Sequence, residues 1–369
     1  MGPYKDVSIN FDWNSNVIGG ASFLDSVRGI GVDVVTWAFA TGECGSETWG
    51  GIPGQTLAAA NVKTWAAAGQ RYIVSTGGAA GIFTCGTGAG FSAFVDRYMS
   101  DAMIGVDFDL EGTQSETIIM SIVQRVKTAQ KKYPSLTFSF TLATLGGTQL
   151  AQPSLGRVGV MTMGVIQKLQ LQNYKVNLMT MDYGSAAVGN CITDGSGSCN
   201  MSASAIQAAK NLNQQFGVPY RQMEVTPMIG GNDSPGETFT INDAVVVSDF
   251  ATTNGLDVHY WSWDRDNDCP PGPASPTCNS YGQAGPLGFA KTFASSSVQP
   301  TKPTQPTTQP TTQQPQPTKS PTKGCWDIPQ DPVCGDCTGC FWESQNICYA
   351  TYPREACEAH VDAFFRWCG

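Results

Sequence analysis

The sequence has few charged residues and no surplus of basic ones. Asp, Glu, Lys and Arg make up 14% of the 369 residues, whereas about a quarter is usual for a globular protein. The net charge of −9 comes from 30 acidic and 21 basic side chains. A protein without a basic surface has little to neutralise phosphates with, so we expect neither nucleic acid nor an anionic membrane as a partner. A neutral or weakly polar substrate fits this composition better.

Long apolar runs and an export signal are also missing. No apolar run reaches the roughly 18 residues that cross a bilayer. Residues 1–13 lack the pattern of a signal peptide, and we interpret them as a mature or recombinant start from which any export signal has been removed. Thirteen cysteines, seven of them after residue 324, are typical of disulfides in a secreted, extracellular protein. Their odd number leaves at least one unpaired within the chain.

The composition changes abruptly at residues 298–323. This segment consists almost entirely of Pro, Thr, Gln, Ser and Lys, and Val298 is its only aliphatic residue. Such a composition cannot form a core, so we interpret the segment as an extended linker. It separates a large domain, residues 1–297, from a small Cys-rich domain, residues 324–369.

Before the linker, strand-like and helix-like patterns alternate. Helical patterns such as 55–69, 116–133 and 202–217 lie between the expected strands. The eight expected strands are 6–13, 32–40, 70–78, 103–112, 136–144, 175–184, 222–231 and 256–264. Eight strand-helix units predict an α/β fold, the (β/α)8 TIM barrel, with catalytic residues at the strand ends. A doubly wound sheet is the competing interpretation, but no Gly-rich phosphate turn follows the first strand.

The fourth expected strand carries three acids at alternate positions. Because side chains alternate along a strand, Asp107, Asp109 and Glu111 share one face, and we expect that face to point into the barrel. Residues two apart have Cα atoms about 6.6 Å from each other, so carboxylates in a poorly hydrated space cannot all be charged cheaply. Such crowding keeps one carboxyl protonated near neutral pH, as a general acid requires.

Two structural alternatives exist for these acids. Acids at a strand end can cap the next helix, but Thr113 or Ser115 is a better cap here. Acids can also bind Ca²⁺, but a calcium loop spaces its ligands over a longer, Gly-turned segment. We therefore favour the catalytic interpretation, and we expect neither a metal nor a cofactor.

The acidic segment "GVDFDLEG" resembles the D-G-x-D-x-D-x-E signature of glycoside hydrolase family 18, the chitinases and their relatives. Further matches follow in the order of that family: "STGG", "MTMDYG", "TPMIGGND" and "YWSWDRD" on the third, sixth, seventh and eighth expected strands. The resemblance covers roughly residues 5–295. The acidic motif is its most specific part.

The resemblance implies a retaining mechanism without an enzyme nucleophile. Glu111 would protonate the glycosidic oxygen, and the N-acetyl carbonyl of the substrate would attack the anomeric carbon. Asp109 would orient the acetamide and stabilise the oxazolinium ion, while Asp107 would share a proton with Asp109. The substrate must then carry a 2-acetamido sugar, as chitin, chitooligosaccharides and N-glycan cores do.

Five further residues are expected to bind substrate. Asp182 and Tyr183 end the sixth strand, where the family places polar groups that contact the acetamide or the leaving sugar. Trp261 ends the eighth strand, where an indole forms the floor under the distorted ring, although Trp263 could compete for that role. The other two expected contacts are Met179 and Phe39. Tyr183 and Trp261 could instead be core residues, because large aromatic side chains are mostly buried.

The sequence departs from the family pattern at two positions. Ile104 replaces the leading Asp of the signature, which is the position least tied to chemistry. Met181 stands where many members have a Tyr that hydrogen-bonds the acetamide. Either Tyr183 takes over that contact or the contact is missing. Glu111, which non-catalytic relatives usually lose, is present.

The six cysteines before the linker predict local disulfides. Two pairs, Cys191 with Cys199 and Cys269 with Cys278, bracket short loops that a disulfide would rigidify. By elimination, Cys44 pairs with Cys85 and joins the loops after the second and third strands.

The Cys-rich segment 324–369 is too short for a core of its own and must be cross-linked. It carries more aromatic side chains than so small a domain can bury: Trp326, Trp342, Tyr349, Tyr352 and Trp367. Our hypothesis is a carbohydrate-binding module that holds the enzyme on insoluble polymer; alternatively, the aromatic residues fill the domain.

Together these observations predict a secreted, monomeric chitinase that hydrolyses β-1,4 bonds between N-acetylglucosamine units, with chitin or chitooligosaccharides as its partners. Internal, endo-type cleavage is expected because the short segment between the last two strands leaves no room for an extra insertion domain. Two alternatives stay open: an endo-β-N-acetylglucosaminidase acting on N-glycans, and a weakly active chitin-binding, lectin-like protein.

The role of the Cys-rich domain can be tested by truncation. A chain ending at Ser297 should cleave soluble chitooligosaccharides as fast as the whole chain, but it should bind and digest insoluble chitin less well. Sedimentation of both chains with chitin particles measures the binding. Equal binding and equal digestion by the two chains would exclude the tether.

Overall fold

The computed structural model describes residues 1–9, 21–112, 114–149, 151–296, 340–342, 347–349 and 365–367. The chain forms two compact units, Met1–Ser297 and Val298–Gly369. In the second unit, β14 (Cys340–Trp342) pairs in antiparallel fashion with β15 (Ile347–Tyr349) and β16 (Phe365–Trp367). The linker 298–323 and the disulfide pairing of the tail lie outside the described residues.

The first unit contains a closed barrel of eight parallel strands. The barrel strands are β1 (Gly2–Asp6), β2 (Val34–Glu43), β5 (Arg71–Gly77), β7 (Met103–Asp109), β8 (Thr137–Ala143), β9 (Tyr174–Met179), β10 (Met223–Thr226) and β13 (Asp257–Tyr260). Each strand pairs with the next, and β13 closes the ring on β1 through the pair Gly2 and His259. This architecture confirms the predicted (β/α)8 TIM barrel.

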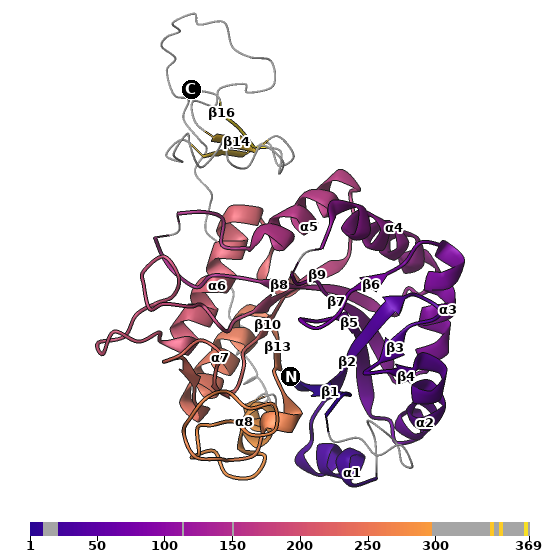
Figure 1. The fold of residues 1–369 in the computed structure, drawn as a ribbon, viewed down its shortest axis with the longest axis horizontal. Helices are drawn as coiled ribbons and strands as arrows, with labels where there is room; N and C mark the ends of the chain where they lie inside the picture. Colours follow the sequence, from indigo (N-terminus) through magenta and orange to yellow (C-terminus); the bar gives the residue numbers. More distant parts are fainter. Residues whose placement is uncertain are drawn as a thin grey trace, which may run out of the picture. The chain divides into compact units, whose positions relative to one another are not determined.

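In the described part of the first unit, eight helices lie outside the strands, and Figure 1 shows them around the barrel. They are α1 (Ala21–Ile30), α2 (Gly54–Ala67), α3 (Gly88–Tyr98), α4 (Glu116–Lys132), α5 (Arg157–Lys168), α6 (Met201–Phe216), α7 (Ile241–Asn254) and α8 (Gly288–Ser296). Their ends follow local chemistry. The hydroxyl of Ser115 accepts from the Ile118 N–H at the start of α4, and Gly217 ends α6 at φ 67°. Of the helices in the described part of the chain, none has the length and apolarity that a membrane crossing requires.

Short elements lie in the loops between the barrel strands and helices. They are β3 (Thr48–Trp49), β4 (Ile52–Pro53), β6 (Phe83–Thr84), β11 (Gly230–Gly231), β12 (Thr238–Phe239), and the 3-10 helices η1 (Tyr220–Gln222) and η2 (Trp263–Arg265). Most of them follow the carboxyl ends of β2, β5, β10 and β13. They therefore build the rim of the barrel on the side where TIM-barrel enzymes carry their sites.

The first strand corrects the sequence-based prediction. We expected it at 6–13, but β1 spans Gly2–Asp6 and a turn follows. The segment "GPYKD" has poor strand propensity, and tertiary packing overrides it. A Cβ at Gly2 would lie 1.8 Å from the carbonyl oxygen of Val34, so the tight approach of the strands requires glycine there. Tyr4 then points into the barrel and is buried.

The alternation of strand β7 matches its prediction. Val106 and Phe108 are fully buried, and Phe108 packs against Phe91 and Phe140 with ring centroids 6.2 and 5.6 Å apart. Because successive side chains point to opposite faces, Asp107 lies on the inner face instead. The outward face therefore contributes the hydrophobic layer between sheet and helices, and the inner face is left for polar groups.

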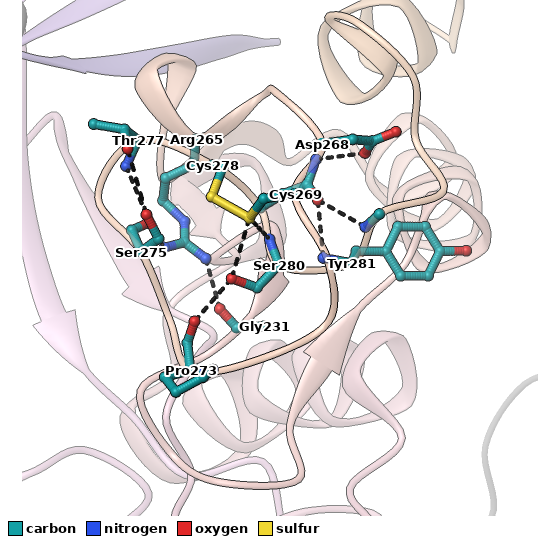
Figure 2. The surroundings of a disulfide bond; sticks show 12 residues. Gly231, Arg265, Asp268, Cys269, Pro273, Ser275, Thr277, Cys278, Ser280 and Tyr281 are labelled. Carbon is teal, nitrogen blue, oxygen red and sulfur yellow. Dashed lines mark hydrogen bonds between the residues drawn. A yellow bond between two sulfur atoms is a disulfide. The ribbon is translucent and has the colours of Figure 1, made fainter.

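All three predicted disulfides of the barrel unit are present: Cys44–Cys85, Cys191–Cys199 and Cys269–Cys278. Figure 2 shows the third, in the long loop after β13. Next to it, the Ser280 hydroxyl donates to the Pro273 carbonyl over 2.8 Å, and buried Arg265 donates to the Gly231 carbonyl over 2.6 Å. The disulfide and Arg265 together hold this loop against the segment after β10.

The disulfides should differ in their contribution to stability. In the chain-entropy account, a bridge closing 41 residues contributes about 4 kcal/mol and one closing eight residues about 2.5 kcal/mol. Replacing Cys44 and Cys85 by Ala should therefore lower the free energy of unfolding more than replacing Cys191 and Cys199. Urea unfolding of the two double variants measures both losses. A larger loss for the shorter loop would contradict the expectation.

Candidate active site

A cavity of about 260 Å³ opens where the barrel strands end. Its lining residues are Tyr4, Phe39, Ala79, Asp109, Glu111, Thr141, Met179, Met181, Asp182, Thr226, Met228, Asp233 and Trp261. They come from strands or strand ends all around the barrel. Because consecutive strands are parallel, their carboxyl ends meet at one face, and residues far apart in the sequence converge there.

Asp107 lies beneath this cavity and is 1% exposed. Four hydroxyl groups surround its carboxylate: Tyr4 at 3.1 Å, Ser75 at 2.6 Å, and Ser139 and Thr141 at 2.8 Å each. Burial raises the pKa of Asp107, and the hydrogen bonds from Ser75 and Thr141 oppose that rise. The site thus replaces water around Asp107 by fixed hydroxyl donors.

Asp109 has the opposite environment. It is 4% exposed, and its Oδ1 atom is buried without a hydrogen-bond partner. Burial, followed by the charges of Glu111 and Asp107, raises the pKa of Asp109 well above its usual range. An unpaired buried acceptor is costly, so this carboxyl group is suited to hold a proton or to accept a hydrogen bond from a ligand in the cavity.

Glu111 is half-buried and lies between two cavities. The second cavity, of about 300 Å³, is lined by Glu111, Ala143, Thr144, Leu145, Gln152, Leu155, Gly156, Met179, Met181 and Asp182. Glu111, Met179, Met181 and Asp182 line both spaces. Burial and the negative charge of Asp182 raise the pKa of Glu111, so this carboxyl keeps its proton to a higher pH than a free glutamate does.

Asp182 is held in a left-handed turn at the end of β9, with φ 49°. Its N–H donates to Oδ1 of Asn232 over 3.3 Å, and its own Oδ1 accepts from the Ser234 N–H over 2.9 Å. Aspartate tolerates this backbone region better than most residues. The loop after β10 therefore determines where the Asp182 carboxylate points.

Tyr183 is not among the residues that line either cavity. Its side chain is 3% exposed, and its N–H donates to Oε2 of Glu237 over 3.1 Å. Met181 lines both cavities, but its thioether is not a donor that could replace a phenol. The structure thus brings Asp182, Met179, Phe39 and Trp261 together with the acids, while it separates Tyr183 from them.

Two aromatic rings form one wall of the cavity. Phe39 and Trp261 stack with centroids 5.6 Å apart and an interplanar angle of 20°, and Tyr4 lies 6.1 Å from Trp261. Trp263 packs against Phe23 at 5.1 Å instead and does not line the cavity. Of the two tryptophans at this strand end, Trp261 is therefore the one available to a ligand.

Several polar residues of the site were missed in the sequence. Ser139 and Thr141 alternate with apolar residues on β8, and this alternation of inward hydroxyls was a usable signal. Glu237 had none, because it lies in a short irregular loop. Burial raises its pKa to about 7, and its carboxylate receives the N–H of Tyr183, which anchors the turn of Asp182.

One group of described residues has metal-ligand geometry. Possible ligand atoms of Glu43, Cys44 and Cys85 lie within 4.8 Å of one another. Cys44 and Cys85 form a disulfide, so neither sulfur is a thiolate that could bind an ion. Of the acids at the barrel mouth, Asp107 accepts hydrogen bonds from hydroxyl groups and Asp182 from the Ser234 N–H.

Two curated proteins are similar to parts of this chain, whereas a scan against models of known protein families finds no match. Endochitinase 11 of Metarhizium anisopliae is 33% identical over 188 residues, which are 47% of this chain and 34% of that protein. A probable bifunctional chitinase/lysozyme of Escherichia coli strain K12 is 30% identical over 217 residues, 53% of this chain and 23% of that protein. The alignments thus span about a third or less of each relative's length.

Solved structures share the barrel. The catalytic domain of a hyperthermophilic chitinase from Pyrococcus furiosus superposes with a TM-score of 0.62 at 23% identity, over 80% of this chain and 93% of that one. Catalytic-site mutants of active domain 2 of a thermostable chitinase from the same organism, complexed with chito-oligosaccharides, give 0.62 at 22%, with the same coverage. By its acidic motif, its curated relatives and its barrel, the part of the chain before the linker is therefore similar to the catalytic domains of glycoside hydrolase family 18 chitinases, which confirms the resemblance indicated by the sequence.

Proposed function

We propose that the protein hydrolyses the β-1,4 bonds between N-acetylglucosamine units of chitin or chitooligosaccharides. The observation that carries this proposal is the buried, unpartnered Oδ1 of Asp109 beside a cavity that also exposes Glu111. An acetamide N–H would satisfy that acceptor, and the acetamide carbonyl would then lie beside the anomeric carbon that it attacks. The proposed substrate class rests on this unmet hydrogen bond taken together with the chitinase relatives.

The proposed reaction proceeds with retention and uses the substrate as its own nucleophile. Glu111 donates its proton to the glycosidic oxygen as the bond to the anomeric carbon breaks. The acetamide carbonyl oxygen attacks that carbon and forms an oxazolinium ion, whose N–H is held by Asp109. Water then adds to the anomeric carbon and gives a proton back to Glu111, while the ring opens to restore the acetamide.

The negative charge opposite the oxazolinium ion is supplied by the pair Asp107 and Asp109. Both are buried, and the pKa of Asp109 is raised partly by Asp107, so a shared proton relieves their repulsion. A preorganised anion in a poorly hydrated site stabilises a developing cation more than water does. Trp261 and Phe39 offer an apolar wall to the sugar ring that carries this charge.

Two adjoining cavities support cleavage within a chain. Glu111 lies at their common boundary, so sugar units can extend to both sides of the bond that it protonates. The segment between β10 and β13 holds only the short strands β11 and β12 and helix α7, with no additional domain over the cavity. We therefore propose endo-type action on a polymer.

Secretion and a monomeric state belong to the same proposal. Three disulfides in the barrel unit require an oxidising compartment to form and persist. Chitin itself is an extracellular, insoluble polymer, which agrees with a Cys-rich second domain acting as a tether. Size-exclusion chromatography with light scattering on the whole chain determines the oligomeric state.

Substitution of the proton donor tests the proposal. Glu111→Gln keeps the shape of the side chain but removes the acid, so hydrolysis of chitotetraose should fall by about 10² to 10⁴-fold. Product formation by chromatography is the measurement, and an unchanged melting temperature shows that the fold persists. Hydrolysis that is insensitive to this change would refute the assignment.

A parallel incubation separates the alternatives. A high-mannose glycopeptide given to the same two proteins should stay intact. Its cleavage by the unsubstituted chain, without cleavage of chitotetraose, would favour an endo-β-N-acetylglucosaminidase. Binding of chitotetraose without any hydrolysis would favour a lectin-like protein.

The pH profile tests the coupling between Glu111 and Asp182. Because the charge of Asp182 raises the pKa of Glu111, Asp182→Asn should lower that pKa. The general acid must be protonated, so the alkaline limb of kcat/KM should move to lower pH. Asp194→Asn, which changes an exposed acid in the loop between Cys191 and Cys199, serves as the control and should leave the limb in place. An alkaline limb that stays unchanged in Asp182→Asn would contradict the coupling.

A further inference from the structure

Beneath the acids, the barrel interior contains an amide that the proposed reaction does not use. Asn177 on β9 is fully buried, and its three hydrogen bonds go to side chains of the two neighbouring strands, β8 and β10, and of β1 across the barrel. Its Nδ2 donates to the Tyr4 hydroxyl and to the Thr141 hydroxyl, over 2.9 Å in each case. Its Oδ1 accepts from the Thr226 hydroxyl over 2.8 Å.

These bonds have a direction. The Thr226 hydroxyl donates to Oδ1, which fixes the amide with its two N–H groups toward Tyr4 and Thr141. Each of those hydroxyl oxygens thereby accepts one hydrogen bond. Its own proton must then be donated elsewhere, and the Asp107 carboxylate lies 3.1 Å from the Tyr4 oxygen and 2.8 Å from the Thr141 oxygen.

Without the amide, another arrangement becomes possible. The Tyr4 and Thr141 oxygens are 3.3 Å apart, and either can be the donor. If Thr141 donated to Tyr4, Asp107 would lose one of its four hydroxyl donors. The Asn177 N–H group already donates to the Tyr4 oxygen and competes there with a donated Thr141 proton, so it disfavours that arrangement.

We propose that Asn177 is a positioning residue: its amide turns two hydroxyl protons toward Asp107 and thereby keeps the negative charge of the acid pair on that residue. Hydrogen bonds to a charged carboxylate are stronger than those between neutral groups, so four aligned donors favour the anion. Asp109, whose Oδ1 has no such partner, is then the member that carries the proton before substrate binds. Asn177 touches neither cavity and acts only through Tyr4 and Thr141.

The other charges around Asp107 do not explain this assignment. Its titratable neighbours are Tyr4, Asp109 and Glu224, and the charge of Glu224 raises the pKa of Asp107. The carboxylates therefore disfavour a charge on Asp107. Hydrogen bonding is the interaction that favours it, and Asn177 determines the direction of two of those bonds.

The effect of Asn177 on catalysis rests on the proposed function. Its effect on the pKa values of Asp107 and Asp109 can be measured in the free protein. The variants are Asn177→Leu, Asn177→Leu/Thr226→Val and Thr226→Val. The double variant also removes the hydroxyl that the first would leave unpaired. Thr162→Val is the matched control. It removes a buried hydroxyl that donates to the Val158 carbonyl within helix α5 and has no hydrogen bond to the acids.

The first readout is the titration of the Asp107 and Asp109 carboxyl carbons by NMR in aspartate-labelled protein, assigned with Asp107→Asn and Asp109→Asn. Asn177→Leu and the double variant should raise the pKa of Asp107 by roughly one pH unit or more. Thr226→Val, which only releases the amide from its fixed orientation, should give a smaller rise. Thr162→Val should give none.

The second readout is the pH profile of chitotetraose hydrolysis. A group that must be ionised and whose pKa rises moves the acidic limb of kcat/KM to higher pH, and a purely structural defect would lower the whole profile without moving that limb. An Asp107 titration that stays unchanged in the folded variants overturns the inference. If Asn177→Leu fails to fold, the absence of a rise in Thr226→Val overturns it equally. Absence of hydrolysis by the unsubstituted chain, with the titration shifted as expected, would refute the proposed function and leave the inference standing.

Discussion

The crowding of three carboxyl groups along the inner face of one strand is the constraint on which the rest of the site depends. Asp107 and Asp109 are both nearly inaccessible to water, and a free carboxylate in such a place is costly. The barrel resolves this in two different ways. It surrounds Asp107 with hydroxyl donors, and it leaves an acceptor of Asp109 unpaired beside the cavity. Two neighbouring aspartates thereby differ in how readily each loses its proton. Acid catalysis with a stabilised cation requires such a difference between neighbouring carboxyl groups.

The loops at the barrel rim position the groups that meet this inner face. Asp182 owes its orientation to contacts with Asn232 and Ser234 in the segment after β10, and Glu237 of the same segment accepts the N–H of the next residue, Tyr183. Arg265, buried after β13, donates to the carbonyls of Ile229 and Gly231 in the same segment. The rim is therefore a set of interlocked loops. Its disulfides and buried polar contacts hold these loops in place beside the cavity.

Much of this could be predicted from the sequence, because periodicity and spacing are local properties. The eight strand-helix units, the acids at alternate positions and the pairing of cysteines across short loops all follow from patterns within a few dozen residues. The first strand was misplaced because Gly2 and Pro3 lower strand propensity, whereas close packing of Gly2 against Val34 makes glycine necessary. Tyr183 illustrates the same limit. Its expected place at a strand end suggested a ligand contact, but β9 ends at Met179, and Tyr183 follows the left-handed turn at Asp182 with its side chain buried.

The sequence by itself determined the fold class, the strand that carries the acids and the face on which they lie, since a period of two along a strand is enough to decide which side chains point the same way. Only the tertiary structure decided which partners those acids meet. Tyr4, Ser75 and Thr141 come from three different strands, and nothing in their local sequence records that they converge on Asp107. Asn177, on a fourth strand, bonds to two of them. The direction of each hydrogen bond, and hence the place of the negative charge, depends on closure of the barrel. Closure pairs β1 with β13 and thereby places Tyr4 within hydrogen-bonding distance of Asp107 on β7 and of Asn177 on β9.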